Sequence, residues 1–530
     1  MENFAASTTS ADMLSYEGFR NEVLNDYRIV FESRETSFIG RKEVLTGKAK
    51  FGIFGDGKEV AQVAMAKFFQ PGDFRSGYYR DQTFMFASGL ATVQQFFAQL
   101  YADPDLRNEP FSAGRQMNSH FATPMVDDNG EWLDLANRKN VSSDIAPTAG
   151  QMVRGLGLAF ASKVFRNLPG QFDGLSNDGN EVCFCTIGDA STSEGQFWET
   201  INAAGVLQVP LVVFVWDDGY GISVPKKYQT VKASISEALR GMEKEDGSNG
   251  YLIYKVKGWD YAGMCEAFEE GVRLSRETHT PVLFHVDEIT QPQGHSTSGS
   301  HERYKTAERL QWEKEWDGRK KMREWIISNV LATDDELHQI EQEAKESVRR
   351  DKLQAWESYL QPIRLQVSKT AELLHDAAQK PGNNGPALEQ LAKELTANRE
   401  PLRRDVMHTL NAATSYTANE DAAFWIRDYY NDLLRENENL FSSHLFNEGP
   451  KSVFNVKAIP VEYSDQSPMV NGFEILNHYF DTLFAANPKV FAFGEDLGYI
   501  GDVNQGFSGL QAKYGEERIF DTGIRELTII

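Results

Sequence analysis

Apolar residues gather in short runs that alternate with amphipathic segments in the middle of the chain. One run (182–187) leads into Gly188-Asp189, and another (211–216) leads into Asp217-Asp218. Between them, from about 194 to 208, apolar side chains recur at helical spacing. This order predicts a strand, a helix and a second strand that runs parallel to the first.

A second unit of the same kind follows. Residues 251–258 are strand-like, an amphipathic segment extends from about 261 to 276, and residues 282–290 are again strand-like. Strands that alternate with helices are typical of a parallel sheet covered by helices on both faces. We therefore expect residues 46–305 to form a doubly wound α/β domain.

The rest of the chain divides by composition. Residues 1–45 read as a helical lead-in. Residues 306–440 are rich in Glu, Lys and Arg at helical spacing, and 441–465 form a linker. Residues 466–530 contain a helix-like segment and an apolar strand, which predicts the start of a second, smaller α/β domain.

Acidic side chains follow both central strands of the first unit. Because parallel strands end at the same sheet edge, Asp189 and the 217–218 pair should lie close together there. Carboxylates suit Mg²⁺, which proteins hold with one or two of them plus phosphate oxygens. Ser191, Thr192 and Ser193 are candidate caps for the intervening helix, whose N-terminus would favour an anion. The alternative is an ordinary acidic turn in a βαβ unit.

The triplet GDA (188–190), the pair DD (217–218) and the following GYGIS resemble the thiamine diphosphate motif. The GYGIS tail is similar to that of the decarboxylating first component of 2-oxo acid dehydrogenase complexes. The resemblance implies that Asp189, Asp218 and the backbone carbonyl of Tyr220 ligate Mg²⁺, with Gly188 and Ala190 beside the cofactor. Asp218 replaces the usual asparagine and adds a negative charge. Trp216 stands where branched-chain members carry a diphosphate-binding arginine.

Further segments resemble the same family. Tyr79 and Arg80, in GYYRD, would contact the diphosphate, as the bidentate guanidinium suits phosphate oxygens. Without the family, Arg80-Asp81 would read as a surface ion pair. His120, in GRQMNSH, would lie in the active-site cleft, although a lone histidine is more often structural or exposed.

Two polar loops complete this resemblance. In SSDI (142–145), Ser143 would lie near the substrate and Ile145 would press thiamine into its bent shape. In GHSTS (294–298), His295 would hydrogen-bond the cofactor or an intermediate and help to pass on the acyl group. The alternative for the second loop is a flexible polar connection. Ser296 matches a serine that is phosphorylated in mitochondrial relatives, a regulation that we do not transfer to this chain.

The C-terminal segment resembles the start of the family's second subunit. Glu495 and Glu526 lie in segments of that type, and Glu526 would hydrogen-bond the aminopyrimidine ring of thiamine. The chain then resembles an alpha–beta fusion whose pyrimidine-binding domain is incomplete. In this family the cofactor lies between domains from different halves of the assembly, so a fused chain implies at least a homodimer.

The composition of the chain excludes some classes of binding partner and indicates a cellular compartment. The formal net charge of −23 argues against nucleic acid or an anionic membrane as a partner. Three cysteines without a metal-binding or disulfide pattern indicate a reducing compartment. The N-terminus has no secretory pattern, and the longest apolar run (207–216) is too short to cross a bilayer. We expect a cytoplasmic protein.

The resemblance implies oxidative decarboxylation of a 2-oxo acid with thiamine diphosphate and Mg²⁺, and transfer of the acyl group to a lipoyl-bearing acyltransferase. The HSTS loop and the GRQM run favour a branched-chain substrate of the 3-methyl-2-oxobutanoate type. A pyruvate dehydrogenase or a transketolase-like enzyme on the same cofactor is an alternative. A non-catalytic cofactor-binding or scaffold fragment is another.

Overall fold

The computed structural model describes residues 15–297, 299–443 and 445–530. At its centre lies a six-stranded sheet with the order β2-β1-β3-β4-β8-β7, in which every neighbouring pair is parallel. Its strands are β1 (Phe74–Ser76), β2 (Asn140–Val141), β3 (Cys183–Gly188), β4 (Leu211–Trp216), β7 (Leu252–Lys257) and β8 (Val282–Asp287). The predicted parallel α/β sheet is confirmed.

Helices cover both faces of the sheet because alternate side chains of a strand point to opposite faces. Val213 and Val215 of β4 pack with α5 (Gly150–Asn167) and α6 (Gly195–Leu207). Phe214 packs on the other face, where α2 (Glu59–Ala66) and α8 (Tyr261–Thr278) lie. Trp216 shares that second face. The central strands are therefore buried on both sides, which explains their continuous apolar runs.

Shorter elements surround this core. They are α3 (Gln82–Ala87), α4 (Val93–Leu100), α7 (Ile235–Ala238) and the small antiparallel pair β5 (Tyr220–Gly221) and β6 (Val224–Pro225).

The predicted helical lead-in contains α1 (Tyr16–Leu45), which belongs to the same core. Residues 1–14 of that predicted segment lie outside the described residues. Arg34 of α1 donates to both carboxylate oxygens of Glu59, at 2.6 and 3.0 Å, and to Asp317 at 2.7 Å. Arg34 is completely buried, so this group of charges fixes α1 against the start of α2 and of α10 (Gly318–Ser328).

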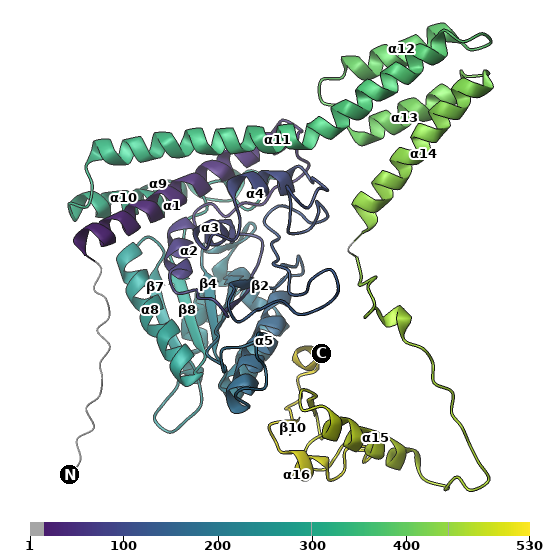
Figure 1. The fold of residues 1–530 in the computed structure, drawn as a ribbon. Helices are drawn as coiled ribbons and strands as arrows, with labels where there is room; N and C mark the ends of the chain where they lie inside the picture. Colours follow the sequence, from purple (N-terminus) through teal and green to yellow (C-terminus); the bar gives the residue numbers. More distant parts are fainter. Residues whose placement is uncertain (1–14, 298, 444) are drawn as a thin grey trace.

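The charged region 306–440 is helical. It contains α9 (Ala307–Glu315), α10, the long α11 (Asp334–Ala378), α12 (Gly385–Ala397), α13 (Arg403–Thr414) and α14 (Glu420–Ser442). The first part of α11 packs on the sheet domain as far as Leu360, and from Ile363 it joins a second apolar core with α12–α14. Pro362 lies between the two cores. Figure 1 shows the α12–α14 helices at the far end of α11, away from the sheet.

The segment after α14 is extended and exposed, with one short 3-10 turn at Val453–Asn455. It leads to α15 (Gly472–Ala486), β9 (Ala492–Gly494), α16 (Leu510–Tyr514), β10 (Ile519–Asp521) and α17 (Glu526–Ile529). β9 and β10 pair in parallel, and Phe484, Phe507, Leu510 and Ile519 form a small core. The identity of this unit as a pyrimidine-binding domain stays a prediction.

Among the described residues, no helix combines the length and apolar character needed to cross a membrane. All three cysteines are free, and Cys183 and Cys185 are buried on β3, where they pack as core residues.

Candidate active site

The two central strands end in register. Gly188 of β3 is the parallel partner of Trp216 of β4, and the Asp189 amide donates to the Trp216 carbonyl at 3.1 Å. The Asp217 amide in turn donates to the carbonyl of Val286 on β8. The carboxylates of Asp189 and of the 217–218 pair therefore leave the sheet at the same edge, as the strand pattern predicted.

A cavity of about 420 Å³ lies at this edge. Eight of the predicted site residues line it: Tyr79, Arg80, Gly188, Asp189, Ala190, Asp218, Tyr220 and His295. They come from the ends of β1, β3 and β4 and from the loop after β8, so segments far apart in the sequence meet there.

Asp189 is a buried carboxylate of this cavity that lacks a full set of partners among the described residues. It is 6% exposed, and its Oδ2 atom has no hydrogen-bond partner in the described chain. Burial, with the nearby carboxylates of Asp218 and Asp217, raises the pKa of Asp189 well above its usual value. A buried oxygen of this kind needs a proton or a cation.

Asp218 is held more firmly. Its Oδ2 accepts a hydrogen bond from the Lys58 ammonium at 2.9 Å, and its Oδ1 accepts one from the Tyr220 amide at 3.2 Å. Burial opposes ionisation, but Lys58, with Arg80 and Lys305 nearby, lowers the pKa of Asp218. Asp218 is therefore ionised beside Asp189, and the two can offer oxygen ligands to a divalent cation.

The Asp217 side chain pairs with His285 and Lys226 instead. Its Oδ2 lies 2.9 Å from Nε2 of His285 and 2.8 Å from the Lys226 ammonium. Asp217, His285 and Asp287 could together hold a metal ion by distance. However, Lys226 also reaches Asp287 at 3.2 Å, and Lys255 pairs with the other oxygen of Asp287 at the same distance. These lysines are partly exposed and already supply the positive charge, which makes this group an ion-pair cluster.

Arg80 anchors two loops of the cavity. Its guanidinium donates to the carbonyl of Phe54 at 2.8 Å and to that of His295 at 2.9 Å. The alternative of a surface Arg80–Asp81 pair is wrong, because Arg80 is buried and Asp81 instead pairs with Arg75 at 2.5 Å. Arg80 thus joins the segment before α2 to the loop after β8.

His295 lies on that loop, half-buried at the cavity wall. Burial, reinforced by the Arg80 cation, lowers its pKa to about 4. The ring is therefore neutral at pH 7, so one nitrogen can donate a hydrogen bond while the other accepts one. The backbone carbonyl of the next residue, Ser296, accepts a hydrogen bond from Arg41 of α1 at 3.0 Å, which ties the loop to the core.

The predicted cap of the intervening helix is wrong. Residues 190–193 form a 3-10 turn, and α6 begins after Glu194, whose side chain makes no capping bond. Thr192 is turned back and donates to the Asp189 carbonyl at 2.6 Å, while Ser193 donates to the Gln229 carbonyl at 3.0 Å. Ser191 lines the cavity. The hydroxyls stabilise the turn that carries Asp189 rather than the helix.

Three predicted residues do not line the cavity. His120 is buried behind Tyr79, with the rings stacked 6.3 Å apart, and its Nε2 has no partner in the described chain. Ser143 is exposed and its carbonyl accepts a hydrogen bond from Arg154. Ile145 packs against Gly150 at the start of α5. We find Thr148 of the same loop at the cavity instead.

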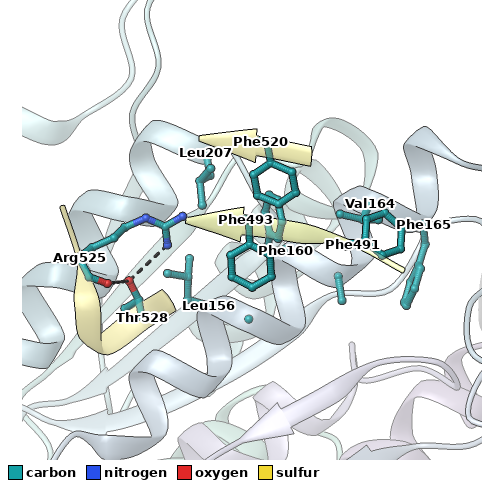
Figure 2. Close-up of a pocket in the computed structure, with 12 residues that line it drawn as sticks. Leu156, Phe160, Val164, Phe165, Leu207, Phe491, Phe493, Phe520, Arg525 and Thr528 are labelled. Carbon is teal, nitrogen blue, oxygen red and sulfur yellow. Dashed lines mark hydrogen bonds between the residues drawn. The ribbon is translucent and has the colours of Figure 1, made fainter. Parts of the chain in front are cut away.

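Glu495 and Glu526 are not brought to this cavity within one chain. Both are exposed, and α17 contacts α6 through the Thr528 amide, which donates to Glu199 at 2.8 Å. A separate apolar cavity of about 230 Å³ lies between α5 and the C-terminal unit. Figure 2 shows Phe160, Phe493 and Phe520 around it, with Arg525 hydrogen-bonded to Thr528 at one end.

Sequence reasoning missed Lys58, the ion-pair partner of Asp218, and Gln291, which lines the cavity and accepts from the same ammonium at 3.0 Å. The feature of the sequence that could have indicated Lys58 is its place in the glycine-rich segment FGDGKE (54–59), directly before a helix. Nothing in that spacing connects it with residue 218.

Comparisons with known proteins agree with this geometry. A family model described as "Dehydrogenase E1 component" matches residues 28–363. A pyruvate dehydrogenase E1 component subunit alpha from Rickettsia bellii is 28% identical over 199 residues, which cover 38% of this chain and 55% of that protein. The mitochondrial 2-oxoisovalerate dehydrogenase subunit alpha 2 of Arabidopsis thaliana is 24% identical over 314 residues, 58% of this chain and 57% of that protein.

The matches to these two relatives span little more than half of the relatives' own length. The family match, by contrast, extends over more than half of this chain and includes the whole sheet and the cavity residues at its edge. The chain therefore belongs to the dehydrogenase E1 component family of thiamine diphosphate-dependent 2-oxo acid dehydrogenases.

Proposed function

We propose that this protein decarboxylates a 2-oxo acid with thiamine diphosphate and Mg²⁺ and passes the acyl group to the lipoyl group of an acyltransferase partner. The observation that carries the proposal is the Oδ2 atom of Asp189, which has no hydrogen-bond partner among the described residues and is buried beside the ionised Asp218 in a cavity that Arg80 borders. The two carboxylates are suitable ligands for Mg²⁺, and the Arg80 guanidinium is a suitable partner for a diphosphate. The residues that line the cavity therefore fit thiamine diphosphate and Mg²⁺.

In this proposal Asp189, Asp218 and the Tyr220 carbonyl hold Mg²⁺. Tyr79 and Arg80 face the diphosphate, beside Gly188 and Ala190. Bound thiamine diphosphate would supply the electron sink for the electron pair that stays on the substrate carbon when CO₂ leaves. The neutral imidazole of His295 can donate one hydrogen bond and accept another within the cavity, and Arg80 holds its backbone in place.

We further propose that the C-terminal unit serves a second copy of the chain. Glu526 would hydrogen-bond the aminopyrimidine ring, yet it lies away from the cavity of its own chain. A homodimer in which each C-terminal unit completes the partner's site would reconcile this proposed role with the position of Glu526. The alpha–beta fusion is part of this proposal.

The substrate is proposed to be a branched-chain 2-oxo acid, on the HSTS loop and the GRQM run. Pyruvate is the competing substrate, because relatives named for pyruvate and for 2-oxoisovalerate match at similar identity. Release of CO₂ from carboxyl-labelled 3-methyl-2-oxobutanoate and from pyruvate, with ferricyanide as the electron acceptor, compares the two. We expect faster turnover of the branched substrate. Binding of thiamine diphosphate without decarboxylation of any 2-oxo acid would refute the catalytic proposal.

A further inference from the structure

Lys58 is a buried cation at the back of the cavity. Its side chain is 1% exposed, and its ammonium donates to Asp218 Oδ2 at 2.9 Å and to Gln291 Oε1 at 3.0 Å. Both acceptors line the cavity, whereas Lys58 lies behind them. The ammonium therefore reaches the cavity through these two side chains.

The position of Lys58 is fixed by its surroundings. Gly57 has φ +90°, and a Cβ there would lie 1.8 Å from the Thr290 carbonyl oxygen, so the loop before α2 presses directly on the segment that leads to Gln291. On the other side, Glu59 is held by Arg34 and by the Gly57 amide. The ammonium has little freedom to leave Asp218.

A buried ammonium is costly unless a carboxylate and further acceptors surround it. In the described chain, Asp218 is the carboxylate that forms an ion pair with Lys58. Asp218 itself adds a negative charge beside Asp189, whose Oδ2 has no hydrogen-bond partner in the part of the chain that the structure describes. The ammonium offsets that added charge.

We propose that Lys58 is a positioning residue of the metal site: it holds the Asp218 carboxylate in place and cancels the extra charge that this residue brings to the Mg²⁺ site. The proposal rests on the proposed function, and it makes Lys58 and Asp218 a coupled pair. Lys58 acts through Asp218 and does not itself contact the cofactor.

The test is a double-mutant cycle on metal affinity. Mg²⁺ binding at saturating thiamine diphosphate is measured by titration calorimetry for the unchanged protein, Lys58→Gln, Asp218→Asn and the double variant. Lys58→Gln should weaken Mg²⁺ binding by about 10-fold or more, because the Asp218 carboxylate is no longer held in place. Asp218→Asn should weaken it by a similar factor, because the Lys58 ammonium is left unpaired beside the cation site. The double variant should lie within about 3-fold of the unchanged protein, because no buried charge is left unpaired.

Lys67→Gln is the matched control. Lys67 also pairs with two carboxylates, Glu22 and Asp26, but on α1, away from the cavity. The Lys67→Gln variant should have a lower melting temperature and an unchanged Mg²⁺ affinity. A loss of affinity in Lys58→Gln then cannot be explained by reduced stability of the fold.

Two results would overturn the inference about Lys58 and leave the proposed function intact. One is unchanged Mg²⁺ affinity in Lys58→Gln, and the other is a double variant in which the two losses of affinity simply add. If Lys58→Gln does not fold, the double variant is compared with Asp218→Asn, where removal of Lys58 should tighten Mg²⁺ binding; no gain overturns the inference. Failure of the unchanged protein to bind thiamine diphosphate would instead remove the proposed function, and this inference with it.

Discussion

Gly188 at the end of β3 and Trp216 at the end of β4 are register partners in neighbouring parallel strands. This pairing brings the carboxylates that follow each strand to one edge of the sheet. It also explains why Asp189 and Asp218 interact, although a helix separates them in the sequence.

Asp189 should be needed for the metal and not for the fold. Its Oδ2 is buried and has no hydrogen-bond partner among the described residues, so Asp189→Asn removes no hydrogen bond of this atom within the described chain. We expect the variant to melt at the same or a higher temperature than the unchanged protein without ligand. Its Mg²⁺-dependent affinity for thiamine diphosphate should fall about 100-fold or more, because a neutral amide oxygen replaces the charged carboxylate ligand. Scanning calorimetry without ligand measures the melting temperature, and titration calorimetry measures the affinity for thiamine diphosphate. Retained affinity would exclude Asp189 from the metal site.

Arg80 should control the loop that carries His295. Arg80→Lys cannot bond to both the Phe54 and the His295 carbonyls, because an ammonium lacks the guanidinium fork. We expect faster amide hydrogen exchange in residues 291–297 and about 10-fold weaker binding of thiamine diphosphate. Arg107→Lys, on an exposed arginine paired with Asp105, is the control. Equal exchange in the two variants would contradict the account.

His295 should stay neutral well below pH 6. Its folded pKa of about 4 lies below the value of about 6.5 expected in the unfolded chain. The neutral form therefore stabilises the fold above pH 6.5, and this contribution is lost as the pH falls towards 4. The unfolding free energy of His295→Gln should vary less with pH between 6.5 and 4 than that of the unchanged protein, measured by urea unfolding. An identical pH dependence would contradict the prediction.

The buried Arg34 should matter for global stability. It bonds to Glu59 and Asp317, and Arg34→Met would leave these carboxylates in the core without their cation. We expect a loss of about 3–5 kcal/mol in the free energy of unfolding. Arg28→Met, at a half-exposed arginine 4.0 Å from Glu343, should cost less than about 1 kcal/mol. Similar losses would show that α1 is not integrated in the core.

The sequence predicted the parts of the site that depend on strand order. Apolar runs that end in Asp189 and Asp217-Asp218 were sufficient to place those residues at one edge, because the strands are parallel neighbours. The cap of α6 was mispredicted because Thr192 bonds to a carbonyl within its own turn, a local choice that composition does not reveal.

Long-range contacts were beyond sequence reasoning. Lys58 and Asp218 are 160 positions apart, and their ion pair depends on how α2 packs against the sheet. His120 illustrates the same limit: its motif placed it near the cavity, but only packing puts Tyr79 in front of it.

We propose above that Asp189 and Asp218 hold the metal of a thiamine diphosphate site. Crystals grown with thiamine diphosphate and Mn²⁺ in place of Mg²⁺ test it directly, because anomalous scattering locates the manganese. We expect a manganese peak within ligand distance, about 2.0–2.3 Å, of carboxylate oxygens of both residues. A peak instead among Asp217, His285 and Asp287, or none at the sheet edge with the cofactor bound, would contradict it.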